Sequence, residues 1–184
     1  MKNKIRIFVA VELPVAVQKE IERVQHILKA SALFEGRFAN LQQSHITIKF
    51  IGDVMLKDIP SIHTALQDVI FSPSKAQLDR IGIFGTDHII KVVYLNIVSP
   101  ELAQLALTID HQLEPWCMLE VREFVSHVTL ARVKKVVDKK ALLDFIEGIT
   151  INPIIFTIDK FVLMESVLTP EGPDYKRLYV YEHS

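Results

Sequence analysis

His45-Ile46-Thr47-Ile48 is matched later in the chain by His127-Val128-Thr129-Leu130, and this pair of tetrapeptides is the strongest indication of the fold. Each lies in a run of β-branched and apolar residues that is typical of a strand. Side chains alternate between the two faces of a strand, so the His and Thr of each tetrapeptide share one face. The two apolar residues share the other face. Each strand is therefore expected to present a His/Thr pair on one side and to pack against a core on the other.

The same order of elements surrounds each tetrapeptide. Apolar periodicity predicts strand, helix, strand, helix, strand in each half, with a short final strand at residues 178–181. These elements span residues 5–13, 15–30, 45–51, 59–70 and 76–84, then 89–98, 101–113, 125–132, 139–149 and 155–168. Neither a Ser/Gly-rich nor a highly charged stretch separates the halves. We therefore expect one domain over residues 1–184, built of two pseudo-symmetric lobes at about 1–86 and 87–184.

The composition indicates a globular protein whose ligand is contacted over a small area. Of 184 residues, 49% are hydrophobic, and 21 Lys and Arg stand against 22 Asp and Glu, for a formal net charge of −1. This balance argues against a protein that coats long nucleic acids, because such proteins need many Lys and Arg to displace phosphate counterions. A ligand contacted at one or two phosphates remains compatible with it.

The cysteine count and the N-terminal residues indicate the compartment. Cys117 is the single cysteine, so neither an intramolecular disulfide nor a cysteine-rich zinc site is expected, and a reducing interior suits the chain. The first apolar run ends at Glu12 and Pro14, which is too short for a membrane-spanning helix or a signal sequence. We expect a cytoplasmic monomer with no membrane partner.

Two histidines and two threonines suit phosphodiester chemistry without a metal, provided that both His/Thr faces line one cleft. In-line displacement at phosphorus needs a base for the nucleophile and an acid for the leaving oxygen, and imidazole, with a pKa of about 6.5, serves as either at neutral pH. Threonine hydroxyls can donate to the non-bridging oxygens. A lone His/Thr pair on a half-buried strand is usually structural, so it is the duplication that favours a site.

The sequence resembles the two-histidine (2H) phosphoesterases, and within them the archaeal-like RNA 2′,3′-cyclic phosphodiesterases, also called 2′-5′ RNA ligases. The resemblance covers nearly the whole chain. It rests on the stretches RIFVAVELP (residues 6–14), HITIKFIGD (45–53), SHVTLAR (126–132) and SVLTPEG (166–172). It implies an α+β fold, bilobed and duplicated, with two antiparallel-rich sheets flanking a central cleft and helices on the outside.

The resemblance also implies a substrate and residue roles. The substrate is an RNA 3′ end bearing a 2′,3′-cyclic phosphate, which is opened to a 2′-phosphate without a cofactor or metal. By analogy with the family, His45 is the proton donor to the leaving 3′ oxygen and His127 is the proton acceptor that activates water. Thr47 and Thr129 then hold the phosphate, and Arg132, five positions after the second histidine, is a further phosphate ligand.

Strand parity raises two questions about the residues that follow the motifs. In a regular strand Arg132 would point away from the face of His127, so its expected role needs a bulge, a twist or a strand end beyond Leu130. Lys49 shares the parity of His45, so it is expected either to line the cleft as an auxiliary cation or to lie on the surface at the strand end.

Alternatives in substrate, direction and class stay open. The same chemistry could act on small cyclic nucleotides or on tRNA-splicing intermediates. The reverse reaction, which joins RNA ends through a 2′-5′ bond, uses the same groups. In a different class, the chain would be a non-catalytic protein that binds RNA ends, although the complete pair of His/Thr motifs argues against this.

Overall fold

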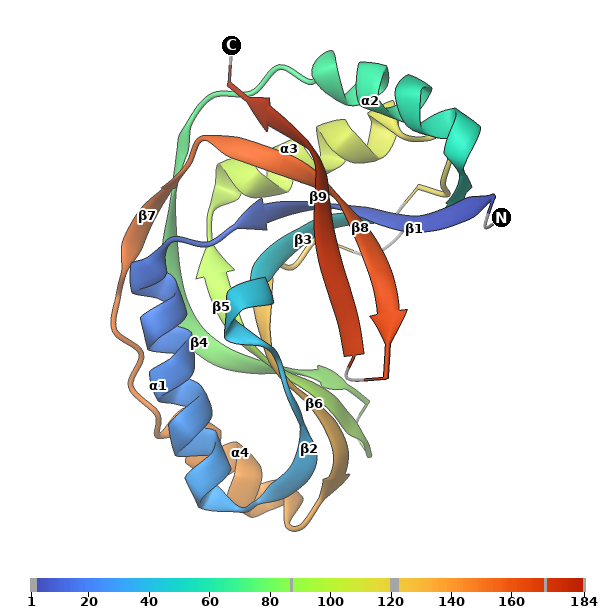
Figure 1. Ribbon diagram of the computed structural model, residues 1–184. Coiled ribbons are helices and arrows are strands. Elements are labelled where there is room, and N and C mark those ends of the chain that lie inside the picture. The colour runs from blue at the N-terminus through green and yellow to red at the C-terminus, as the bar shows by residue number, and fades with distance from the viewer. Residues whose placement is uncertain (1–2, 87, 120–122, 171, 184) are drawn as a thin grey trace.

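Two antiparallel β-sheets with α-helices on their outer sides make up the computed structural model, which describes residues 3–86, 88–119, 123–170 and 172–183 (Figure 1). The strands are β1 (Lys4–Glu12), β2 (Phe34–Phe38), β3 (His45–Met55), β4 (Ser74–Gly85), β5 (Ile90–Val98), β6 (His127–Val136), β7 (Ile155–Ile158), β8 (Lys160–Thr169) and β9 (Gly172–Glu182). The helices are α1 (Val15–Ser31), α2 (Ile59–Gln67), α3 (Pro100–Gln112) and α4 (Lys139–Glu147), with 3-10 turns η1 (Leu41–Gln43) and η2 (Leu56–Asp58). The α+β fold with two antiparallel sheets is confirmed.

The two halves of the sequence exchange strands between the sheets. One sheet has the order β3-β1-β8-β9 and the other has the order β2-β6-β5-β4-β7. In the first half, β1 pairs with β3, while β4 pairs with β5 of the second half. In the second half, β5 pairs with β6, while β8 pairs with β1 of the first half. The predicted boundary near residue 86 therefore does not separate two lobes, because each sheet contains strands from both halves of the chain.

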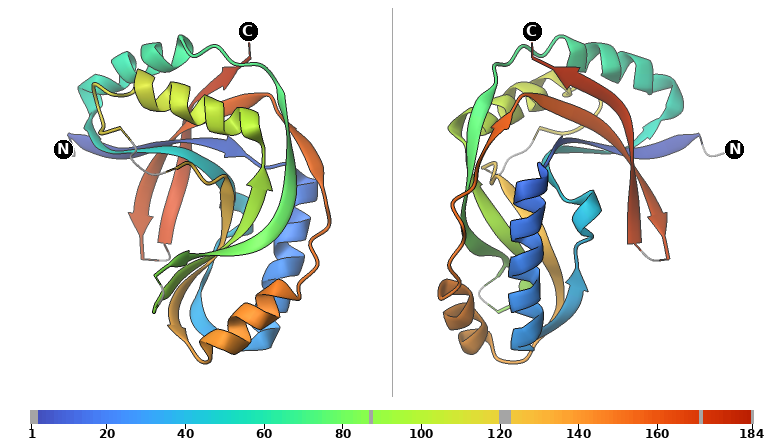
Figure 2. Two further views of the ribbon diagram at one scale, coloured as in Figure 1. Left: turned by 180° about the vertical axis from the view of Figure 1, so that it is seen from behind. Right: turned by 60° about the vertical axis from the view of Figure 1, so that its left-hand side comes forward.

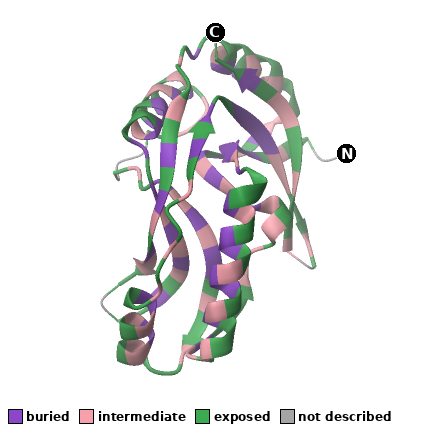
Figure 3. Cartoon of the chain, turned by 90° about the vertical axis from the view of Figure 1, so that its left-hand side faces the viewer, coloured by how far each residue is buried: buried purple, intermediate pink, exposed green. Residues whose placement is uncertain are grey.

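The helices cover the outer sides of the sheets, away from the space between them (Figure 2). Helix α1 packs against β6, and α3 packs against β3. The apolar residues of α1 recur at helical spacing, and Val17, Ile21, Val24 and Leu28 are buried. In Figure 3 the ribbon of α1 carries both buried and exposed residues along its length. The main core thus lies between each sheet and its helices.

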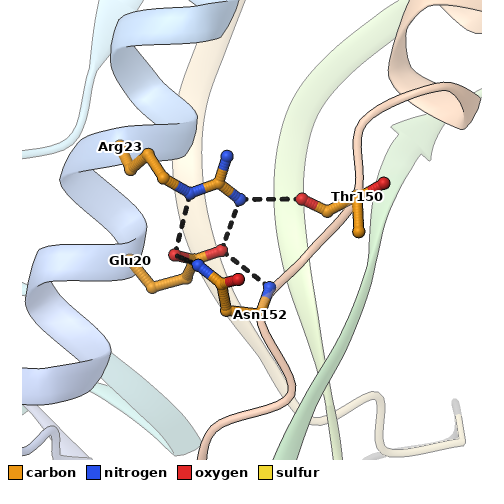
Figure 4. Close-up of polar contacts among 4 residues, drawn as sticks. All are labelled: Glu20, Arg23, Thr150 and Asn152. Carbon is orange, nitrogen blue, oxygen red and sulfur yellow. Dashed lines mark hydrogen bonds and ion pairs between the residues drawn. The ribbon is translucent and has the colours of Figure 1, made fainter.

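A polar cluster ties α1 to the segment that follows α4 (Figure 4). Glu20, only 3% exposed, accepts hydrogen bonds from Arg23 Nε at 2.9 Å and from Asn152 Nδ2 at 2.7 Å. Arg23 also donates to the Thr150 carbonyl oxygen at 2.7 Å. The Arg23 guanidinium and the Asn152 donors outweigh the opposing effect of burial and lower the pKa of Glu20. A buried carboxylate with this many donors is well compensated.

The strands differ from the sequence predictions in three places. Strand β2 was not predicted, because no element was expected between residues 30 and 45. In the structure a Cβ on Gly36 would overlap the Arg132 carbonyl of β6, so the glycine permits close strand pairing. The predicted strand over residues 155–168 is divided into β7 and β8, which lie in different sheets, and the last strand extends over Gly172–Glu182. None of the described helices is long and apolar enough to cross a membrane.

Candidate active site

The two histidines are held in the same way at the start of their strands. His45 opens β3, and its Nδ1 lies 2.8 Å from the carbonyl oxygen of Gln43. His127 opens β6, and its Nδ1 lies 2.7 Å from the carbonyl oxygen of Val125. A carbonyl oxygen only accepts, so Nδ1 carries the proton in both rings. The Nε2 atom of each neutral imidazole is therefore left as the acceptor.

Each imidazole packs against one phenylalanine and one tyrosine. The His45 ring centroid lies 4.9 Å from that of Phe8 and 5.0 Å from that of Tyr175. The His127 ring centroid lies 4.7 Å from that of Phe84 and 5.2 Å from that of Tyr94, both edge-to-face. These aromatic neighbours fix the ring orientations and remove water from one side of each ring.

Burial lowers the pKa of both histidines below the ordinary value of 6.5. The charge of His127 lowers the pKa of His45 further, and the charge of Arg132 does the same for His127. In each ring the hydrogen bond to the backbone carbonyl opposes the change. His127 is thus close enough to His45 to influence its protonation.

One cavity of about 760 Å³ brings together all five residues that the sequence singled out: His45, Thr47, His127, Thr129 and Arg132. This volume lies in the range of small-molecule sites and is far larger than a single phosphate needs. In the described part of the chain, no three His, Cys, Asp or Glu side chains gather to form a metal site. The cavity offers two imidazoles, two hydroxyls and a guanidinium, a set suited to an anionic ligand.

A β-bulge at the last residue of the second motif turns Arg132 into the cavity. In the pairing of β5 with β6, Val93 faces Ala131 and Tyr94 faces Thr129, so Leu130 is the extra residue. The bulge leaves Leu130 and Ala131 both buried and reverses the parity beyond them. Arg132 therefore shares the cavity face with Thr129, by the bulge that its expected role required.

An equivalent bulge in the first motif places Lys49 in neither of the two positions expected from the sequence. Val9 faces Lys49 and Ala10 faces Thr47, so Ile48 is the extra residue in β3. Lys49 is consequently turned into the interior, 7% exposed, and neither lines the cavity nor lies on the surface. It forms an ion pair with Asp110 of α3 and donates to the Met118 carbonyl oxygen at 2.8 Å. Lys49 is therefore a structural residue.

Three further cavity residues were not predicted as site residues, and for Phe50 the sequence favours a core position over base stacking. Phe50 takes the position in β3 that Arg132 takes in β6, five residues after the histidine, and is 64% exposed. Tyr175 reaches the site from β9, and Arg37 reaches it from β2. The position of Phe50, five residues after its histidine as Arg132 is after the other, would have indicated that Phe50 lies at the cavity. Nothing local in the sequence indicates the other two, because they depend on how distant strands pair.

Comparisons with known proteins agree with this geometry. The family model of the 2′-5′ RNA ligase superfamily matches residues 13–169. The RNA 2′,3′-cyclic phosphodiesterase of Methanocaldococcus jannaschii is 31% identical over 93% of this chain and 96% of its own length. The protein of the same name from Methanothermobacter thermautotrophicus is 28% identical over 97% of this chain and 98% of its own length.

Solved structures show the same fold. The E. coli LigT structure in complex with 3′-AMP has a TM-score of 0.77 at 21% sequence identity, covering 98% of this chain and 99% of that one. The TT0787 structure of Thermus thermophilus has a TM-score of 0.75 at 21% identity, covering 96% of this chain and 97% of that one. With the family match over residues 13–169, these likenesses lead to one conclusion: the chain belongs to the 2′-5′ RNA ligase superfamily.

Proposed function

We propose that this protein is an enzyme that hydrolyses RNA 2′,3′-cyclic phosphate ends to 2′-phosphates by acid/base catalysis with two histidines. The observation that carries the proposal is the matched pair of imidazoles on one cavity, each with Nδ1 held by a backbone carbonyl two residues earlier. The names of the relatives support the substrate class. Paired histidines supply both proton transfers that opening a cyclic phosphodiester requires.

The proposed reaction is one in-line displacement at phosphorus. His127, in its neutral form, accepts a proton from water at Nε2 as the water oxygen bonds to phosphorus. His45, in its protonated form, donates its Nε2 proton to the 3′ oxygen as the bond between that oxygen and phosphorus breaks. The products are a 2′-phosphate and a 3′-hydroxyl. Thr47 and Thr129 donate to the non-bridging oxygens, and Arg132 compensates the charge that they gain.

The position of Arg132 supports this assignment of acid and base. Its charge adds to the lowering of the pKa of His127, which favours the neutral form that a base needs. In the reverse direction the same groups would join a 2′,3′-cyclic phosphate to a hydroxyl as a 2′-5′ bond. We infer that the protein acts in the cytoplasm, because a reducing compartment suits a chain with the single cysteine Cys117. We also infer that it acts as a monomer.

Product analysis tests the proposal. An RNA oligonucleotide with a 2′,3′-cyclic phosphate end is incubated with the protein in EDTA, and the product is compared with synthetic 2′-phosphate and 3′-phosphate standards. The expected result is complete conversion to the 2′-phosphate at an unchanged rate in EDTA. Tight binding without product would identify an RNA-end binding protein instead, and a 3′-phosphate product would reverse the proposed leaving group.

A further inference from the structure

Two arginines stand side by side at one wall of the cavity. Arg37 of β2 and Arg132 of β6 are direct register partners in the antiparallel pair, and both line the cavity. Like charges placed opposite each other on neighbouring strands destabilise a sheet. Their placement is understandable if this wall of the cavity meets more than one negative charge of a ligand.

From these paired backbone positions, the side chains of Arg37 and Arg132 reach different parts of the cavity wall. The charge of Arg132 acts on His127 and on Tyr175, so it lies beside the reacting centre. The Arg37 guanidinium instead lies against the backbone of Gly172, at the turn between β8 and β9: a Cβ there would be 2.6 Å from Arg37 Nη2. Arg37 thus places a positive charge at the tip of the β8-β9 hairpin.

Both charges are available to a ligand. Among the residues that the structure describes, no ion pair involves Arg37 or Arg132. Asp174, the described carboxylate that lines the cavity, accepts a hydrogen bond of 2.6 Å from Gln43 Nε2. A guanidinium binds phosphate oxygens through paired N–H donors, which makes phosphate the preferred partner of such a group.

We infer that Arg37 binds the phosphate on the 5′ side of the terminal nucleotide, while the cyclic phosphate on its 3′ side is bound by the histidines and Arg132. The inference rests on the proposed function. An RNA end carries its next negative charge one nucleotide from the cyclic phosphate, and the cavity of about 760 Å³ accommodates that nucleotide. Arg37 would then select RNA ends, or nucleotides with a 5′-phosphate, over a nucleoside cyclic phosphate.

The test compares two substrates that differ by one phosphate: adenosine 2′,3′-cyclic phosphate with and without a 5′-phosphate. The measured quantity is the ratio of their kcat/KM values. We expect the wild-type protein to favour the 5′-phosphorylated substrate by about tenfold or more, as for a hydrogen bond to a charged group. Arg37→Gln brings the ratio close to one, and Arg37→Lys, which keeps the charge, retains part of the preference.

Two further variants test whether the change in the kcat/KM ratio is specific to Arg37. Arg132→Gln lowers kcat/KM for both substrates and leaves their ratio unchanged. Arg80→Gln, which changes a side chain that is 80% exposed and is not among the residues lining the cavity, changes neither value. A wild-type ratio near one, or an Arg37→Gln variant that keeps the wild-type ratio, overturns the inference alone. A wild-type protein that opens neither these substrates nor a cyclic phosphate at an RNA end overturns the proposed function instead.

Discussion

At the scale of single residues, the site is nearly symmetric in its histidines and asymmetric in its charges. Both imidazoles carry the Nδ1 proton toward a carbonyl oxygen and both pack between aromatic rings. Five residues beyond each histidine, however, one strand carries Phe50 and the other carries Arg132. The guanidinium therefore distinguishes two otherwise similar groups, and in the proposed mechanism its charge favours His127 as the base.

The pH dependence of kcat/KM tests this distinction. Because the pKa of both histidines is lowered from 6.5, we expect a bell-shaped profile with its maximum below about pH 6.5. Arg132→Gln removes a neighbouring positive charge, so the pKa of His127 rises. A base must be neutral, so the acidic limb moves to higher pH while the alkaline limb moves less. Movement of the alkaline limb instead would reverse the assignment of acid and base.

Phe50 gives a second test at this scale. Its exposed ring on the cavity wall offers a face on which the terminal base can stack, and stacking of this kind contributes about 1–3 kcal/mol per base. We expect Phe50→Ala to raise KM about tenfold or more with little change in kcat. Substitution of Phe50 by Tyr keeps the ring and should keep the wild-type KM. Equal loss in both variants would exclude stacking as the cause.

The structural role of Lys49 can be tested through its ion pair with Asp110. Lys49→Met removes the cation that compensates a buried carboxylate, and breaking such a pair typically costs about 3–5 kcal/mol. We expect that loss in the free energy of unfolding, measured in urea. The double variant Lys49→Met with Asp110→Leu should recover most of the loss. A fully stable single variant with impaired chemistry would instead return Lys49 to the active site.

Single-residue predictions from the sequence succeeded where they depended on local alternation. The placement of His45, Thr47, His127 and Thr129 on one cavity follows from the period of two along a strand and from the duplication. Lys49 was misplaced by the same rule, because one extra residue reverses every side chain beyond it. The backbone hydrogen bonds that set a bulge involve the partner strand, which the local sequence does not describe.

At the scale of elements, the hairpin of β8 and β9 carries part of the cavity. Gly172, at its turn, has a φ of +128°, a conformation that side chains with a Cβ rarely adopt, and its backbone lies against Arg37. Thr169 Oγ1 donates to the Gly172 carbonyl oxygen at 2.7 Å and closes the turn. The glycine thus permits both the turn and the close approach of the arginine.

Replacing this glycine should affect stability and substrate preference together. Gly172→Ala is expected to lower the free energy of unfolding by about 1–3 kcal/mol and, by displacing Arg37, to reduce the preference for a 5′-phosphate. Gly148→Ala is the matched control, because Gly148 has a φ of −75° and its Cβ would make only ordinary contacts. That variant should be neutral or slightly stabilised. Equal melting temperatures for the two variants would exclude strain at Gly172.

How accurately each helix or strand could be predicted depends on how clear its apolar periodicity is. The four α-helices begin within a residue of their predicted starts, since each has a clear apolar face or an N-terminal Pro or Asp. Strand β2 escaped because its central residues are polar or glycine and exposed. Most of β9 escaped for a similar reason, since residues before Leu178 are largely polar and exposed. These strands owe their conformation to pairing with β6 and β8, which lie far away in the sequence.

At the scale of the whole molecule, the strand exchange and the charge balance define the kind of substrate. Because β8 and β9 cross to the sheet of β1 and β3, residues from both halves of the chain surround one cavity. The formal net charge of −1 leaves no general attraction for RNA. Positive charge is instead provided locally by Arg37 and Arg132, so the protein is suited to an RNA end and not to the body of an RNA.

Substrate length and salt test this small footprint. Among cyclic-phosphate oligonucleotides of increasing length, we expect kcat/KM to reach its full value with two nucleotides. The slope of log kcat/KM against log salt should then stay near −0.7 to −1.4, about 0.7 for each of one or two neutralised phosphates. A slope that steepens steadily from two to ten nucleotides would reveal an extended RNA-binding surface.

Catalysis by two histidines on one phosphate is tested most directly by the kcat/KM of His45→Asn and His127→Asn on an RNA with a 2′,3′-cyclic phosphate end, measured in EDTA. Asparagine retains a donor for the backbone carbonyl but cannot transfer the proton. Each variant is predicted to fold with the wild-type melting temperature and to lose about 10²–10⁴-fold in kcat/KM. Wild-type kcat/KM in either variant would contradict the proposed mechanism.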